Sequence, residues 1–519
     1  MESTSEEGTK APEPRKWAVT RQLVLVTLVT SFGSSLQYGY NLWVANHPAT
    51  LVQVFHNSTL QKKKITIEAS LLTLLYSLTN STFSLGGLIG SLLVSPMVDR
   101  CGRKGALVLN NIYSIFASLI LGCSAVVRAY EYAIFSRLVI GVSSGIFSSA
   151  VPLYLGEVAP RNLRGSVIIV SLIFLTAGIL ISQILSLQKF LGAQKDWPIL
   201  LSLNGFLAVF QVIVLPTFPE SPRYLLIQKK DEEKARQALK KLRCQDDVES
   251  EVEELYEEDI SEKMEKDMNG LKLLCYRGLR WQVISVAILM GGQQLTGFTA
   301  VIYYANKIYI TTHLKKQEAH YYNVLSVAFL IFTLMVMAYT VDSVGRRILI
   351  LTGFGICSIA CILLAMTIEL QPGMPWMSYV TRVLFFLFFF GHTLGPASIP
   401  YVLMLELFLQ SSRSTAFAIG GFVQWLLQFL VKLFFLQIEI RIGSYTFLLF
   451  WPICIAVFIY IFKIVPETKN KTFVDIKRLM SANMAKKIQV QGANPEHSKT
   501  RKRATHHSVK AMRRATMPS

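Results

Sequence analysis

Apolar runs of about 20 residues recur from Arg21 to Lys463, and only brief polar stretches separate them. A helix of that length crosses about 30 Å of hydrocarbon. Hydrophobic residues make up 52% of the 519 residues and charged residues only 16%, against about 25% charged in ordinary globular proteins. A soluble chain of this size would instead divide into domains joined by polar linkers. The pattern predicts an all-α membrane protein.

We expect twelve transmembrane helices in two six-helix halves, with an intracellular helical linker between them. The expected spans are 21–41, 70–95, 106–127, 132–155, 166–188, 198–218, 281–305, 321–341, 347–368, 378–407, 414–436 and 444–465. The domains follow as a cytoplasmic N-terminus (1–20), an N-terminal half (21–218), a linker (219–280), a C-terminal half (281–465) and a basic tail (466–519). Within the linker, opposite charges three and four residues apart at 231–241 favour a surface helix.

Charge bias orients these spans, because cytoplasmic segments carry an excess of Lys and Arg. Most of the 52 basic residues fall inside if both termini are cytoplasmic. Residues 1–20 have no apolar core and no cleavage site, so the first span is expected to act as the insertion signal. Among three glycosylation sequons only Asn57 lies in an outer loop, and we expect modification there. We expect a multi-pass protein of the plasma membrane.

Other classes of function find little support in the sequence. The formal charge is +19, but the positive residues lie between and after apolar runs rather than on a folded basic face, so nucleic-acid binding is not expected. The seven Cys show no metal-ligand spacing. We find no nucleophile–base pair and no Gly-rich ATP-binding motif. We therefore expect no enzyme activity, no metal or cofactor, and no partner protein. The expected surroundings of the chain are the lipid bilayer.

Two groups of charges repeat along the chain. The sequence Asp-Arg-Cys-Gly-Arg-Lys at 99–104 is followed 243 residues later by Asp-Ser-Val-Gly-Arg-Arg at 342–347. Glu157 with Arg164 is followed 249 residues later by Glu406 with Arg413. Such repetition indicates internal duplication, as in transporters with a substrate site between two halves. Acids and bases that pair in one conformation only would bias a two-state rocking equilibrium.

With these motifs in view, the chain resembles the facilitative hexose transporters of the major facilitator superfamily over about residues 20–480. The resemblance is carried by the two repeated loops, Tyr-Leu-Gly-Glu-Val-Ala-Pro at 154–160, Pro-Glu-Ser-Pro-Arg-Tyr at 219–224, Gly-Gln-Gln-Leu at 292–295 and Pro-Glu-Thr-Lys at 466–469. Segments 32–35, 37–41, 391–392 and 408–413 look most like the fructose-transporting branch. The resemblance implies a gating charge network of Arg103, Glu157, Arg164, Glu220, Arg223, Asp342, Arg346, Glu406, Arg413 and Glu467.

An uncharged sugar needs amide and hydroxyl groups and an aromatic face rather than a charged clamp. Gln293 and Gln294 offer amides beside Thr296-Gly297, where glycine permits a helix break, and Tyr303 and Tyr304 follow. Helix breakers at 395–396 and 399–400 predict a hinge. Trp425 is expected to stack on or cap the sugar. The full expected substrate set, which the resemblance extends, is Gln293, Gln294, Tyr38, Thr299, His392 and Trp425.

Several positions depart from the resembled family. Amides expected in spans five, seven and eight fall on Leu172, Thr299 and Leu330, and Lys432 is a charge within a span. Proton-coupled relatives carry Asp where this chain has Asn41, which cannot cycle a proton. We therefore expect a uniporter for a hexose, glucose or fructose. A transporter of another small solute and a non-transporting membrane protein remain open as alternatives.

Overall fold

Almost every residue that the computed structural model describes lies in a helix, as the apolar pattern predicts. The structure describes residues 18–44, 69–127, 130–187, 190–191, 197–263, 279–311, 316–469, 471, 476 and 478–480. Asn57, the expected glycosylation site, lies outside the described residues. The chain divides into two compact units, Met1–Lys266 with Val327–Ser343 and Asp267–Ser326 with Val344–Ser519.

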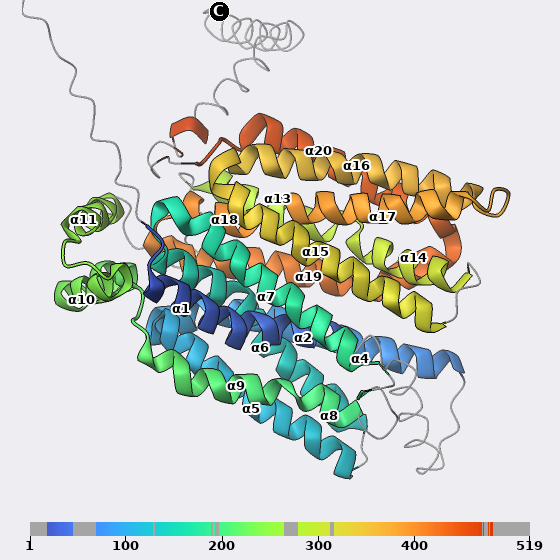
Figure 1. Cartoon of the computed structure of the whole chain (residues 1–519), viewed down its shortest axis with the longest axis horizontal. Helices are drawn as coiled ribbons and strands as arrows, with labels where there is room; N and C mark the ends of the chain where they lie inside the picture. The colour runs from blue at the N-terminus through green and yellow to red at the C-terminus, as the bar shows by residue number, and fades with distance from the viewer. Residues whose placement is uncertain are drawn as a thin grey trace, which may run out of the picture. The chain divides into compact units, whose positions relative to one another are not determined.

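The first six expected spans are all helical (Figure 1). The first span consists of α1 (Arg21–Thr30), a π-helical turn at Ser31–Ser35 and α2 (Leu36–Trp43). The next four spans are the single helices α4 (Ala69–Cys101), α5 (Arg103–Val127), α6 (Tyr130–Val158) and α7 (Arg164–Leu185). The sixth span consists of α8 (Trp197–Ser202) and α9 (Asn204–Val214).

The last six expected spans are helical too. The seventh is divided into α13 (Arg280–Gln294) and α14 (Phe298–Thr311), and the tenth into α17 (Met377–Leu394) and α18 (Ile399–Leu407). The others are α15 (Lys316–Val344), α16 (Arg346–Leu370), α19 (Gln410–Ile442) and α20 (Thr446–Ile464). The part of α15 at Val327–Ser343 belongs to the first unit.

Nine helices of the described part are long and apolar enough to cross a membrane. The first, third and sixth expected spans are not among them, and each contributes a buried amide to one chain of hydrogen bonds. Nε2 of Gln37 donates to Oδ1 of Asn111, and Nδ2 of Asn111 donates to Oε1 of Gln211, both at 2.8 Å. These buried amides join the helices of the three spans inside the first unit.

The helices α2 and α7 approach each other at two glycines. A Cβ atom on Gly39 would lie 1.8 Å from the carbonyl oxygen of Leu175, and one on Gly178 would lie 2.2 Å from that of Leu36. Both distances are far below van der Waals contact. The close approach of these two backbones therefore requires glycine on each helix, which is a common device for packing helices in membranes.

We expect Gly39→Ala to destabilise the protein, because the new methyl group forces α2 and α7 apart at a cost of about 1–3 kcal/mol or more. The measurement is the melting temperature of purified protein, read by size-exclusion chromatography after heating. Gly122→Ala is the matched control, since in the described part no atom beyond its own helix backbone lies within 4 Å of the added Cβ. A melting temperature that falls equally in both variants would contradict the packing argument.

Both breaks in the second unit occur at the residues that the sequence indicates. Gly297 has φ of +94° and separates α13 from α14. This backbone angle is readily available only to glycine. In the tenth span, residues 395–398 separate α17 from α18, and Pro400 then lies in the first turn of α18, where a missing N–H costs nothing.

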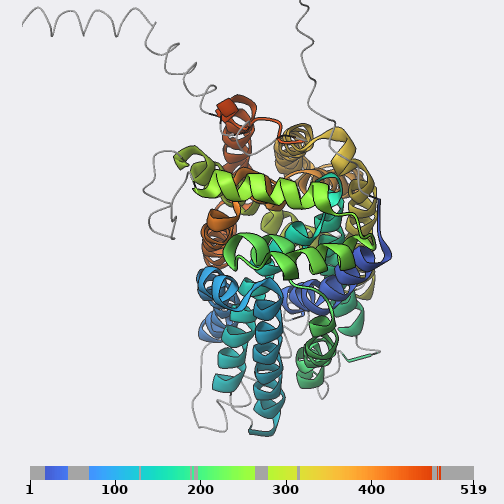
Figure 2. The ribbon, with the colours of Figure 1, turned by 90° about the vertical axis from the view of Figure 1, so that its left-hand side faces the viewer.

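The expected linker helix is present and packs against a second one (Figure 2). The two helices are α10 (Glu232–Arg243) and α11 (Glu249–Lys263), and Asp231 caps α10 by accepting a hydrogen bond from the Lys234 N–H at 3.1 Å. Their shared apolar core includes Leu239, Val252 and Leu255. At the other end of α10, the Thr20 hydroxyl donates to the carbonyl of Leu242 at 2.6 Å, which ties the linker to the start of α1.

Candidate functional site

A buried ion pair joins the first turn of α5 to the last turn of α6. Nε of Arg103 donates to Oε2 of Glu157 at 2.9 Å, and both side chains are 0% exposed. Arg103 also donates to Gln228 at 2.8 Å and lies over the ring of Tyr224. The hydroxyl of Ser221 donates to the same Glu157 oxygen at 2.5 Å. These extra contacts offset part of the cost of burying two charges.

Glu220 caps the beginning of α5. Its carboxylate accepts hydrogen bonds from the backbone N–H groups of Arg103 at 3.1 Å, Lys104 at 3.0 Å and Ser221 at 2.9 Å. The first N–H groups of a helix have no partner within the helix and carry the positive end of its dipole. A carboxylate at this place therefore fixes the loop at 219–222 onto α5. We call Arg103, Glu157, Glu220 and Ser221 the first cluster.

The second unit contains the same arrangement. Arg346, at the start of α16, donates to Oε1 of Glu406 through Nε at 3.1 Å and lies 3.0 Å from it through Nη2. The Thr468 hydroxyl donates to Oε2 of Glu406 at 2.5 Å. Glu467 accepts from the backbone N–H groups of Arg346 and Arg347, both at 3.0 Å. We call Arg346, Glu406, Glu467 and Thr468 the second cluster; it matches the first cluster member by member.

A glycine with positive φ precedes the helix in each cluster. Gly102 has φ of +81° and Gly345 has φ of +104°. A Cβ on Gly102 would lie 2.5 Å from Oε2 of Glu220, and one on Gly345 would lie 2.8 Å from Oε2 of Glu467. Both the backbone angle and the space taken by the capping carboxylate therefore explain the glycine in the repeated loops at 99–104 and 342–347.

Stability should depend on pH through Glu220. Burial raises the pKa of Glu220, although the hydrogen bonds from Lys104 and Ser221 and the charges of Arg103 and Lys104 oppose the rise. A raised pKa of an acid contributes stability that is complete below the unfolded-state pKa and is lost as the pH rises through the folded-state value. The melting temperature of the wild type minus that of Glu220→Gln should therefore fall as the pH rises through this window. A difference that increases with pH would contradict this expectation.

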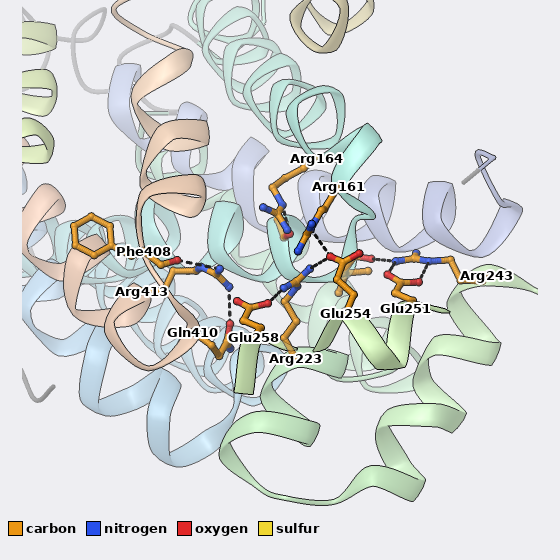
Figure 3. Close-up of polar contacts among 12 residues, drawn as sticks. Arg161, Arg164, Arg223, Arg243, Glu251, Glu254, Glu258, Phe408, Gln410 and Arg413 are labelled. Carbon is orange, nitrogen blue, oxygen red and sulfur yellow. Dashed lines mark hydrogen bonds and ion pairs between the residues drawn. The ribbon is translucent and has the colours of Figure 1, made fainter. Parts of the chain in front are cut away.

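The other charges of the expected network have different partners (Figure 3). Arg223 pairs with Glu258 and Glu254 of the linker helix α11, and Arg161 also reaches Glu254. Nε of Arg164 donates to the carbonyl of Gly156 at 3.1 Å. The corresponding Arg413 of the second unit donates to Oε1 of Gln410 at 2.6 Å and to the carbonyl of Phe408 at 3.1 Å.

Asp342, near the end of α15, contacts the beginning of α7. Its Oδ2 accepts hydrogen bonds from the backbone N–H of Ser166 at 2.9 Å and from the Ser166 hydroxyl at 2.6 Å. The side chain also fills the space beside Gly165, where a Cβ would lie 2.5 Å from Oδ1. Asp342 thus caps the first turn of α7.

The sequence did not predict several members of these networks. Ser221 and Thr468 occupy equivalent places in Pro-Glu-Ser and Pro-Glu-Thr, so comparing these two short motifs would have revealed them. The linker carboxylates Glu254 and Glu258 gave no such signal. A buried pair in the linker was missed as well: Arg243 donates to both oxygens of Glu251, at 2.8 and 2.7 Å, and to the carbonyl of Val158 at 3.1 Å.

Five of the six expected substrate residues belong to the second unit, and Tyr38 belongs to the first. Gln293 lies in the last turn of α13 beside the break and is 8% exposed. Its Nε2 donates to the carbonyl of Ala397 at 3.3 Å, in the break of the tenth span. Its Oε1 is buried and has no hydrogen-bond partner among the described residues. An unmet buried acceptor at a helix break is suited to a ligand hydroxyl.

His392 lies next to this break. Its Nδ1 is 3.1 Å from the hydroxyl of Thr296, and its ring stacks on that of Phe298 with the centroids 4.5 Å apart. Gln294 and Thr299 are half-buried, whereas Trp425 is fully buried and Tyr38 is 6% exposed. Leu172, Leu330 and Lys432, the residues that depart from the resembled family, are each half-buried.

The two tyrosines of α14 share one carboxylate that the sequence did not bring forward. The Tyr303 hydroxyl donates to Oε2 of Glu439 at 3.1 Å, and the Tyr304 hydroxyl donates to Oε1 at 3.2 Å. Glu439 lies in α19 and is 5% exposed. Part of the seventh span is therefore held against the eleventh span by charge-assisted hydrogen bonds.

Comparison with known sequences gives a consistent result. Residues 26–480 match the family model described as sugar (and other) transporter. The chain is 46% identical over 486 residues to solute carrier family 2, facilitated glucose transporter member 5, of Equus caballus, covering 93% of this chain and 97% of that protein. It is 45% identical over 478 residues to member 7 of Homo sapiens, covering 92% and 93%.

A solved structure shares the fold. The proton:xylose symporter XylE of the major facilitator superfamily, bound to 6-bromo-6-deoxy-D-glucose, matches with a TM-score of 0.78 and 20% identity, covering 90% of this chain and all of that one. The fold is therefore that of the major facilitator superfamily, with twelve transmembrane helices, and the chain is a multi-pass membrane protein. By the match of its sequence over residues 26–480, the chain belongs to the sugar (and other) transporter family.

Proposed function

We propose that the chain is a facilitative uniporter that moves a hexose, fructose or glucose, across the plasma membrane by alternating access. The observation that carries this proposal is the 46% identity over 93% of the chain to a protein named as a facilitated glucose transporter. Members of this family transport solutes and are not enzymes. Both termini lie in the cytoplasm in this proposal, because that orientation puts most of the basic residues of the connecting segments on the cytoplasmic side.

The two clusters support a mechanism in which closed and open states exchange. Each cluster fixes the start of a helix (α5 or α16) to a carboxylate near the end of another (α6 or α18) and to a following loop. Glu220 and Glu467 add the loop contacts, and Asp342 caps α7. Breaking these contacts costs free energy, so they favour the conformation in which they form. We assign the gating role to these residues together with Arg164, Arg223 and Arg413.

The polar groups of the second unit support an uncharged, hydroxyl-rich substrate. Gln293 offers a buried oxygen without a protein partner, and His392 offers a ring nitrogen. Gln294, Thr299, Tyr38 and Trp425 complete the proposed set. Asn41 cannot take up and release a proton as a carboxylate does, which favours uniport over proton coupling.

One observation favours a second candidate, the transport of a less polar solute. Leu172, Thr299 and Leu330 replace three amides of the resembled family, and all three are half-buried. Leaving a sugar hydroxyl without a partner in a closed site costs about 1–3 kcal/mol. A cargo with fewer hydroxyl groups would not incur this loss.

Uptake into proteoliposomes without an ion gradient tests the proposal. Purified protein should take up labelled fructose or glucose in a saturable manner, and an imposed proton gradient should not concentrate the sugar. If neither sugar enters vesicles that contain correctly folded protein, hexose transport is excluded. A panel of less polar solutes in the same vesicles then tests the second candidate.

A further inference from the structure

Three buried cysteines lie in α16 and α20 of the second unit, and two of them contact the backbone of the break between α13 and α14. Cys357 and Cys361 lie in α16 and Cys454 lies in α20; all three are free thiols and are buried. The thiols of Cys361 and Cys454 both donate to the carbonyl of Thr296, at 3.6 and 3.8 Å. Two separate helices thus direct a donor at one carbonyl in the break between α13 and α14.

This carbonyl lies just ahead of the helix that follows the break. The first backbone hydrogen bond of α14 runs from the N–H of Val301 to the carbonyl of Gly297 at 3.0 Å. The Thr296 carbonyl precedes it by one residue, and the thiols supply donors there. Thiol hydrogen bonds are weak, but two converging ones restrict the rotation of this peptide group and so restrict the position of Thr296.

The hydroxyl of Thr296 lies between a backbone carbonyl of α13 and the ring of His392. It is 3.0 Å from the carbonyl of Gln293 and 3.1 Å from Nδ1 of His392. A carbonyl oxygen can only accept, so the bond to Gln293 uses the single hydroxyl proton. In that arrangement the hydroxyl accepts from His392, which requires a proton on Nδ1. In a neutral imidazole this leaves Nε2 as a hydrogen-bond acceptor.

We propose that Thr296, held by Cys361 and Cys454, is a positioning residue that selects the Nδ1-protonated tautomer of His392 and so presents Nε2 as an acceptor to a sugar hydroxyl. Among the described residues, His392 makes its hydrogen bond at Nδ1, and Nε2 has no protein partner. The buried Oε1 of Gln293 is a second acceptor without a protein partner in the same region. Two acceptors recognise hydroxyl groups, which donate. This inference rests on the proposed function.

The tautomer can be read without any substrate. In protein labelled with ¹⁵N-histidine, nitrogen–proton correlation spectra distinguish a protonated from an unprotonated Nε2, and His392→Gln identifies the signals of His392. The wild type and Thr296→Ser should show protonation at Nδ1. Thr296→Val keeps the size of the side chain but removes the hydroxyl, so it should shift the population toward protonation at Nε2. Protonation at Nε2 in the wild type would overturn the proposal.

Uptake kinetics test the consequence for sugar. Thr296→Val should raise the KM about tenfold or more with a smaller effect on Vmax, and Thr296→Ser should remain near the wild type. The double variant Cys361→Ala with Cys454→Ala should also raise the KM. The matching double Ser variant retains the donors, so its KM should stay near that of the wild type. Cys101→Ser with Cys244→Ser, at exposed thiols of the first unit, is the control. Equal KM values for Thr296→Val and Thr296→Ser would overturn the proposal.

The two measurements separate this inference from the proposed function. If the wild type transports no hexose, the proposed function fails, and the histidine spectra still decide whether Thr296 sets the tautomer. If the wild type transports hexose but the Thr296 variants leave both the spectra and the KM unchanged, the positioning role alone is refuted.

Discussion

Replacing Arg103 by alanine is expected to abolish uptake and to lower the stability of the folded protein by about 3–5 kcal/mol. The variant removes the guanidinium from Glu157, whose side chain is 0% exposed. A carboxylate left buried without its counter-charge must either be desolvated at high cost or draw water between α5 and α6. The measurements are the melting temperature of purified protein and sugar uptake into proteoliposomes.

Arg100→Ala is the matched control, since Arg100 lies one turn earlier in the same loop region and is exposed. Exposed charges of this kind contribute about 0–1 kcal/mol. The double variant Arg103→Ala with Glu157→Gln should recover part of the stability, because it removes the unpaired charge as well. If Arg103→Ala behaves like Arg100→Ala, the buried pair does not hold these helices together.

The second cluster offers an internal comparison. Arg346 and Glu406 repeat the pair with side chains 3% and 10% exposed. Because Glu406 retains some contact with solvent, Arg346→Ala should destabilise the protein less than Arg103→Ala does. If both clusters favour the same conformation, Arg346→Ala should also reduce uptake less than Arg103→Ala does. The melting temperature and sugar uptake of the two variants test both expectations.

Much of this architecture could be predicted from the sequence because each part has a local signal. The apolar runs predicted helices at all twelve expected positions, nine of which are long and apolar enough to cross a membrane in the described part, and glycine and proline predicted the breaks at Gly297 and at residues 395–400. The repetition, at similar offsets, of the motifs with Arg103 and Glu157 as those with Arg346 and Glu406 predicted that the charges form duplicate sets, and the structure pairs them in this way. These features can be predicted from the sequence because they depend only on residue type and spacing.

The sequence did not predict which residues many of these side chains pair with, because the partners come from segments that are distant along the chain and meet only in the fold. Arg223 and Arg161 bind carboxylates of α11, and no spacing rule relates those positions. Glu439 lies 135 residues after Tyr304 and near the end of its helix, where a carboxylate usually indicates solvent. The thiols around Thr296 show no metal-ligand spacing in the sequence, and only their convergence on one carbonyl distinguishes them.

Replacing Gln293 by alanine is the most direct test of the proposed substrate site, and the KM for the transported sugar should rise about tenfold to a hundredfold. The estimate follows from the loss of one or two hydrogen bonds in a closed site, worth about 1–3 kcal/mol. Oε1 of Gln293 is buried without a protein partner, so a ligand is the natural source of its missing donor. Initial rates of uptake over a range of sugar concentrations give KM and Vmax separately.

Two variants decide between substrate binding and a merely structural role for Gln293. Gln293→Leu keeps most of the volume but removes the amide, so it should raise the KM as strongly as alanine does if hydrogen bonds to sugar are responsible. Gln237→Ala, an exposed glutamine on α10, should leave both constants unchanged. Nε2 of Gln293 also donates to the carbonyl of Ala397. If the side chain serves only to hold the break of the tenth span through that bond, its loss will lower Vmax and leave KM unchanged, which would remove Gln293 from the substrate site.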